Sequence, residues 1–60
     1  MNERTLQYYK YLLNMYNFYK NIFSEDSVNC SKLIKEMVRI EYKQSKDDRQ
    51  QLFNLFLRNI

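Results

Sequence analysis

The side chains that could carry out chemistry are few in this 60-residue sequence. There is no His to transfer a proton near neutral pH, and the single thiol, Cys30, has no imidazole to activate it. One Cys without His also excludes an internal disulfide and a Cys/His zinc site. Asp47 and Asp48 lie at a predicted helix start, where carboxylates stabilise the free amides and the helix dipole, so their presence does not indicate catalysis. We therefore expect no catalytic residues and no metal site, and the chain is not expected to be an enzyme.

Cations form the clearest pattern of charged groups. Five of them follow one another at spacings of three, four, four and three residues, so on a helix they fall within roughly 80° of one another. A row of like charges slightly destabilises a helix, and we interpret this row as a surface for an acidic partner, with RNA as another possible contact. The alternative is a solvated face that happens to be basic. These residues, which we term the basic ridge, are Lys32, Lys35, Arg39, Lys43 and Lys46.

Three helices are expected to position these groups. Gly and Pro are absent, so the joints are read from the polar stretches 24–29 and 44–48. Ser45 followed by Asp48 has the spacing of a capping box, which indicates a helix start. The second helix carries apolar residues at three- and four-residue spacings that include Cys30, so its thiol is expected to be buried. We predict an all-α fold, a single domain over residues 1–60 with helices over 3–23, 29–45 and 47–59.

The first predicted helix carries more apolar surface than three short helices can cover. Its twelve apolar and aromatic residues spread over roughly 240°, whereas a helix packed on one side needs about 100°. A core of this size rarely supplies more than about 3–5 kcal/mol. We expect part of the arc to meet a surface outside the chain; the alternative is that amphipathic tyrosines lie half exposed. The remaining polar arc holds Gln7, Lys10, Asn14, Asn17 and Asn21.

The charge balance is mildly basic, with a net charge of +3, which favours acidic partners. No apolar run approaches the 18 or so residues that a membrane span needs. The first 24 residues hold one acid, Glu3, beside three cations, a balance found in organelle-import sequences and in plain basic helix starts. The third helix has only two cations, Arg49 and Arg58, so direct DNA readout is not expected.

Two stretches resemble the LYR-motif family of small three-helix mitochondrial proteins. In that family an aliphatic residue precedes a Leu-Tyr-Arg triplet and a Leu-Leu pair follows it. The stretch LQYYKYLLN at 6–14 is similar, with Tyr8, Tyr9 and Lys10 at the triplet. A second signature, Ile-Arg-x-Glu-Phe-Arg, is matched by Val38, Arg39, Glu41, Tyr42 and Lys43. Lys10 replaces the motif Arg and lacks its planar fork.

The resemblance implies a three-helix antiparallel bundle with an internal tunnel for an acyl chain, located in the mitochondrial matrix. Its partner would be the acidic mitochondrial acyl carrier protein, whose acyl-phosphopantetheine would contact Tyr9, Lys10 and Tyr42 while the basic ridge meets the carrier's carboxylates. The chain would hold no cofactor of its own. Its host would be a larger complex, with the short basic chain favouring the mitochondrial ribosome or a respiratory complex. The alternatives are a structural helical subunit without carrier protein, or a partner of the cysteine desulfurase of iron–sulfur synthesis.

Overall fold

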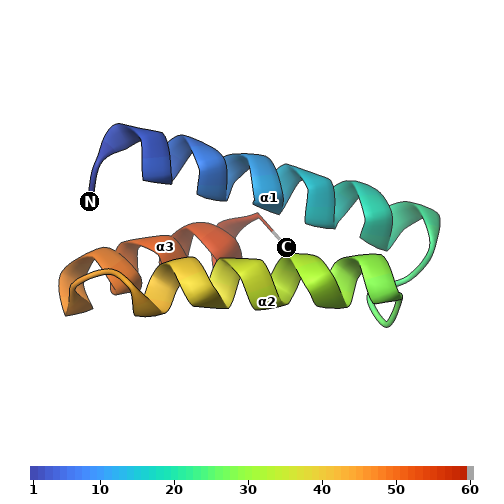
Figure 1. The fold of residues 1–60 in the computed structure, drawn as a ribbon. Coiled ribbons are helices and arrows are strands. Elements are labelled where there is room, and N and C mark those ends of the chain that lie inside the picture. The colour runs from blue at the N-terminus through green and yellow to red at the C-terminus, as the bar shows by residue number, and fades with distance from the viewer. Residues whose placement is uncertain (60) are drawn as a thin grey trace.

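Three α-helices follow one another in an up-down-up order in the computed structural model, which describes residues 1–59 (Figure 1). They are α1 (Glu3–Ile22), α2 (Val28–Tyr42) and α3 (Lys46–Arg58). Residues 1–59 contain no strand, so the predicted all-α class and the three-helix order are confirmed. No helix within this range is both long enough and apolar enough to span a bilayer.

Side chains at each helix start accept hydrogen bonds from backbone amides that have no helical partner. Asn2 Oδ1 accepts from Thr5 N at 2.8 Å, Ser27 Oγ from Cys30 N at 3.3 Å, and Ser45 Oγ from Asp48 N at 3.4 Å. These are the N-caps of α1, α2 and α3.

The caps also explain where the helix bounds differ from those predicted. Ser27 and Ser45 both have extended backbones, with ψ of 155° and 166°, as N-caps require. α2 therefore begins at Val28, and it ends at Tyr42 instead of continuing to residue 45. The capping box at Ser45 is only half formed, because the Asp48 carboxylate accepts a hydrogen bond from the Met1 amino group at 2.7 Å.

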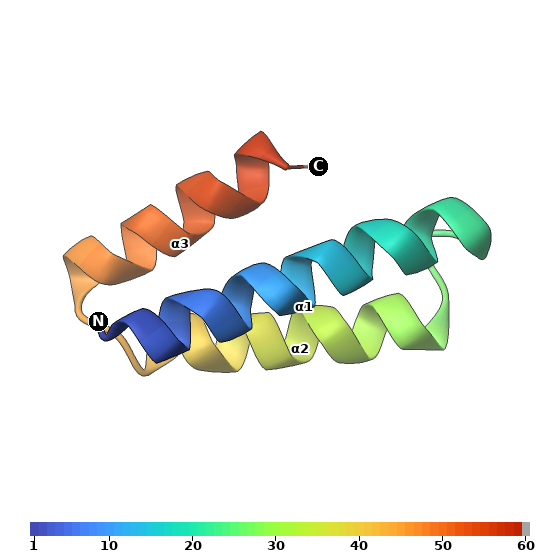
Figure 2. The same cartoon turned by 90° about the horizontal axis from the view of Figure 1, so that it is seen from above.

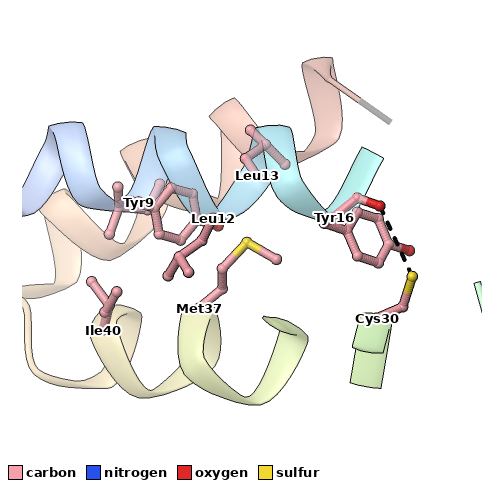
Figure 3. Packing of buried hydrophobic residues seen from close by; sticks show 8 residues of the cluster. Tyr9, Leu12, Leu13, Tyr16, Cys30, Met37 and Ile40 are labelled. Carbon is pink, nitrogen blue, oxygen red and sulfur yellow. Dashed lines mark hydrogen bonds between the residues drawn. The ribbon is translucent and has the colours of Figure 1, made fainter. Parts of the chain in front are cut away.

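The core lies mainly between α1 and α2, which run antiparallel along most of their length (Figures 1 and 2). Figure 3 shows buried side chains of both helices meeting there. The predicted burial of Cys30 is confirmed: its thiol is fully buried and donates to Ser24 O at 3.3 Å and Tyr16 O at 3.9 Å. The buried residues are Tyr9, Leu12, Leu13, Tyr16, Cys30, Met37, Ile40 and Leu52.

α3 lies beside the α1–α2 pair and is held by fewer buried side chains (Figure 2). Leu52 is its one buried residue and is 0% exposed. Near the end of α3, the ring of Phe56 lies 5.7 Å from that of Tyr16, and Asn17 Nδ2 donates to Asn59 O at 2.7 Å. α3 therefore contacts α1 through its last turns, while its first turns follow α2 closely across the three-residue joint.

Candidate functional site

A groove of about 490 Å³ runs between α2 and α3. This volume lies within the range of about 300–1,000 Å³ that is typical of small-molecule sites in proteins. α1 contributes no residue to its lining. The apolar part of the lining is formed by Ile34, Met37, Val38, Phe53 and Phe56.

Polar side chains line the end of the groove next to the α2–α3 joint. Lys46 and Arg49 belong to the first turn of α3 and stand opposite Glu41 and Tyr42 in the last turn of α2. The Arg49 guanidinium lies 5.0 Å from the centre of the Tyr42 ring, and its Nε donates to the Glu41 carbonyl at 3.3 Å. The groove therefore has an apolar length and one end where two cations, Lys46 and Arg49, outnumber the single carboxylate of Glu41. We term this the cationic end, and the distribution suits an amphipathic anion.

Behind this cationic end, Tyr9 connects α1 to the Glu41 side chain. Tyr9 is 0% exposed, and its hydroxyl donates to Glu41 Oε2 at 3.5 Å. Burial, together with the charge and hydrogen bond of Glu41, raises the pKa of Tyr9 well above its ordinary value. Burial also raises the pKa of Glu41, although the bond from Tyr9 and the charge of Arg49 act in the opposite direction. The hydrogen bond between Tyr9 and Glu41 therefore connects the groove wall to the core.

The basic ridge occupies the exposed side of α2. Lys32, Lys35, Arg39 and Lys43 are all exposed, and together with Glu36 the first three line a shallow depression. Arg39 Nη1 lies 3.5 Å from Glu36 Oε2 in an exposed pair. The prediction that all five cations share one helix face is wrong for Lys46, because a new helix, α3, begins at this residue, and Lys46 lines the groove instead.

The ridge and the groove are adjacent on the surface of α2. Val38 and Tyr42 follow Lys35 and Arg39 by three residues, so each lies next to a ridge cation on the helix surface. Val38 is 40% exposed and Tyr42 is 70% exposed, and both line the groove. A ligand in the groove would therefore pass along an apolar edge directly beside the cations.

The three residues expected to contact an acyl-phosphopantetheine are placed differently from one another. Tyr42 lines the groove, and Tyr9 lies behind it in the core, in contact with Glu41. Lys10 is exposed on α1 and does not line the groove. The structure brings Tyr9 and Tyr42 to the same end of the groove and leaves Lys10 outside it.

Arg49 and Glu41 are site residues to which the sequence patterns assigned no role, although Glu41 matches the second signature. The sequence identifies Arg49 only as one of two cations of the third predicted helix. The available signal was the short joint: two helices joined by a three-residue turn run antiparallel, so the first turn of α3 must face the last turn of α2. Within residues 1–59, no three His, Cys, Asp or Glu side chains gather as a metal ion would require.

A second apolar face of α1 points away from the core. It consists of five residues at alternating three- and four-residue spacings, and four of them are about half exposed: 46% for Tyr8, 56% for Tyr11, 58% for Phe18 and 54% for Ile22. Three helices thus leave part of the wide apolar arc uncovered in the described chain. We term this face the outer stripe: Tyr8, Tyr11, Met15, Phe18 and Ile22.

Comparisons of the chain with protein-family models, with curated proteins and with solved structures find no match. The resemblance to the LYR-motif proteins therefore rests on the two motif stretches alone.

Proposed function

We propose that this chain is a non-catalytic adaptor of the LYR type, which binds acylated mitochondrial acyl carrier protein and docks it on a large mitochondrial assembly such as the ribosome or a respiratory complex. The observation that carries the proposal is the position of the apolar groove between α2 and α3, directly beside the basic ridge. An acylated carrier protein offers the matching pair of surfaces, an apolar chain and an acidic domain.

The acyl chain is the part of the ligand that the groove would take. Its apolar lining extends from Val38 towards Ile34 and Phe56, away from the cationic end. Each buried methylene is worth about 0.8 kcal/mol, so ten would contribute on the order of 8 kcal/mol before ordering costs. This exceeds the roughly 3–5 kcal/mol expected from a core of this size, so the ligand would complete the interior of the bundle.

The phosphate of the carrier's arm would bind at the cationic end of the groove. Lys46 and Arg49 are the cations in the lining, and Arg offers a planar fork that suits a phosphate. The family resemblance instead assigns this role to Lys10, which does not line the groove. The two assignments make opposite predictions for single charge reversals.

The acidic carrier domain would lie on the exposed part of the basic ridge. Lys35 and Arg39 flank the apolar edge of the groove, so the carrier would contact the ridge while its arm entered alongside. The contact between opposite charges on an exposed surface is screened by salt, and we expect faster association at low ionic strength.

The proposal is tested by measuring how tightly acylated carrier protein binds to two variants of this chain, each with one lysine changed to glutamate. We expect Lys46→Glu to weaken binding at least about tenfold, because it removes a cation from the groove and from the ridge together. Lys10→Glu changes the net charge equally at a site outside the groove, and the groove geometry predicts a much smaller effect. If Lys10→Glu has the larger effect, the phosphate lies where the motif resemblance puts it. If neither variant weakens binding, the adaptor proposal is wrong.

The outer stripe of α1 favours one further candidate, a structural helical subunit that fills an apolar groove of a complex without any carrier protein. Co-purification separates the two functions. A carrier protein with the added mass of an acylated arm should accompany the chain under the first proposal and be missing under the second. Partnership with the cysteine desulfurase would appear as that enzyme in the same preparation.

A further inference from the structure

The outer stripe has the residue spacing of a helix–helix seam. Its five members follow at intervals of three, four, three and four residues, the pattern of a and d positions in a coiled coil. The core-facing residues of α1, such as Tyr9 and Leu13, lie on a different side of the helix and are already buried. α1 therefore carries two apolar faces, and the described chain covers one of them.

The flank of the stripe is uncharged. Gln7, Asn14 and Asn21 recur every seven residues along one edge, where coiled coils that select a different partner often carry charges. The cations of the basic ridge lie on α2, in the joint that follows it and at the start of α3, so none of them lies along this edge. Two copies of a chain with a net charge of +3 can thus approach through this face without bringing like charges together.

The ends of the stripe are oppositely charged. Arg4 precedes Tyr8 by one helical turn, and the joint that follows α1 carries Glu25 and Asp26, all of them exposed. Arg4 and the joint lie at opposite ends of α1 (Figure 1). If two α1 helices pair antiparallel about Met15, Arg4 of each copy meets the acidic joint of the other. A parallel pair would instead place Arg4 beside Arg4.

The exposed area suits a weak dimer. An aromatic side chain can bury about 150–250 Å², so the half-exposed residues of the stripe offer roughly 100 Å² each. With Met15 and the amide flank, a symmetric pair would bury about 1,000 Å² in total. This is near the lower limit for a specific protein–protein interface, so we expect a weak dimer.

We propose that the outer stripe binds a second copy of this chain, in an antiparallel arrangement with a two-fold axis near Met15. The contact is isologous, so each apolar residue and each charged end is used twice. This inference goes beyond the proposed adaptor function, since it uses neither the groove nor the basic ridge. A helix of a host complex would compete for the same face.

Sedimentation equilibrium of the purified chain tests the dimer, with circular dichroism to follow helical content. Between about 1 and 100 µM we expect a monomer–dimer equilibrium with a micromolar dissociation constant. Tyr11→Glu and Phe18→Glu should each weaken the dimer at least about tenfold, since both bury a charge in the seam. Leu57→Glu is the matched control, because Leu57 is 51% exposed but lies on α3. It should leave the dimer unchanged.

A charge exchange tests the orientation. Arg4→Glu should weaken the dimer, because it places acids opposite acids. Adding Glu25→Lys and Asp26→Lys to the same chain should restore it. Mixing a Tyr8→Cys chain with an Ile22→Cys chain should give a disulfide-linked dimer faster than either chain alone, since both positions lie seven residues from Met15. Buried Cys30 is common to every mixture and serves as the background.

Three results would overturn the proposal. The first is a wild-type chain that stays monomeric over the whole concentration range, which is the result expected if the stripe is reserved for a host helix. The second is a dimer that Tyr11→Glu and Phe18→Glu leave intact. The third is faster crosslinking of Tyr8→Cys with itself than with Ile22→Cys, which would indicate a parallel pair.

Discussion

At the residue scale, the Tyr9–Glu41 contact is the clearest case of a polar group placed by the fold. A buried tyrosine hydroxyl needs a hydrogen-bond partner, and here the partner comes from a residue 32 positions away. Glu41 is partly buried, and its backbone carbonyl accepts a hydrogen bond from Arg49 Nε. On folding, the Glu41 carboxylate loses water contacts and accepts one long hydrogen bond from Tyr9. The effect of burial outweighs the effect of this bond, so the pKa of Glu41 is raised.

This raised pKa predicts how stability depends on pH. Between the ordinary glutamate value of about 4.3 and the raised value, the folded chain binds more protons at Glu41 than the unfolded chain does. The contribution of Glu41 to the free energy of unfolding should therefore fall as pH rises through that interval. Glu41→Gln can still accept from Tyr9 and carries no charge, so it should remove this decline and be at least as stable as wild type at pH 7. Urea unfolding at pH 4, 5.5 and 7 measures the difference.

The pKa of Asp48 is shifted in the opposite direction to that of Glu41, so Asp48 changes the stability in a different pH range. Its hydrogen bond with the Met1 amino group lowers its pKa, so its contribution is lost only as pH falls below the ordinary aspartate value of about 3.9. The two groups can thus be separated in one titration. If Glu41→Gln is clearly less stable than wild type at pH 7, the charged carboxylate stabilises the fold. That result would contradict the raised pKa of Glu41.

At the element scale, α3 is the helix on which the groove depends. It forms one wall and supplies both cations of the lining, yet Leu52 is its only buried residue among those described. Its first turn is fixed by the Ser45 cap and by the bond from Arg49 to Glu41. Its last turns rest on Tyr16 through Phe56. Elements with few buried contacts open at lower free energies, so α3 should be the first part of the bundle to separate.

The two leucines of α3 allow a matched test of this dependence. Leu52 is 0% exposed and Leu57 is 51% exposed. Leu52→Ala should cost about 2–5 kcal/mol, because it removes buried methyl groups and leaves a cavity. Leu57→Ala should cost less than about 1 kcal/mol. Urea unfolding followed by circular dichroism compares the two, and equal losses would mean that α3 does not pack on the core through Leu52.

At the scale of the whole molecule, the chain has a small core and an unusually large apolar exterior. Eight of residues 1–59 are buried, while half-exposed aromatic and aliphatic side chains lie on both α1 and α3. A chain of this length buries only about 60% of the surface that it exposes when unfolded. Under the proposed function, the surface of a partner or ligand would add to this small core.

This imbalance predicts a marginally stable isolated chain. Its free energy of unfolding should not exceed about 5 kcal/mol, and acylated carrier protein at 100 times its dissociation constant should add about 2.7 kcal/mol. Carrier protein without an acyl group is the control and should add less, because the groove stays unfilled. Calorimetry at several concentrations provides the measurement. Sharp unfolding well above about 65 °C as an isolated monomer would contradict the claim that the interior is incomplete.

The sequence by itself was sufficient to determine the features that depend on local spacing. The three helices, both joints, the burial of Cys30 and the exposed cations of α2 follow from periodicity and capping residues, which act within one or two helical turns. The bounds of α2 were wrong by up to three residues because Ser45 takes an extended backbone as a cap. The spacing of Ser45 and Asp48 predicted this cap, but it did not show that Lys43 and Gln44 before it also belong to the joint.

The tertiary structure alone decided which half of the apolar arc of α1 is buried and which cations meet the groove. Tyr9 and Tyr16 face α2 while Tyr8 and Tyr11 face outward, although all four are tyrosines of one helix. Their burial depends on where α2 and α3 pack, and that is set by contacts between residues far apart in the chain. For the same reason Lys46 and Arg49 line the groove while Lys10 does not. The groove forms only where two helices pack side by side, so no single stretch of sequence shows which residues line it.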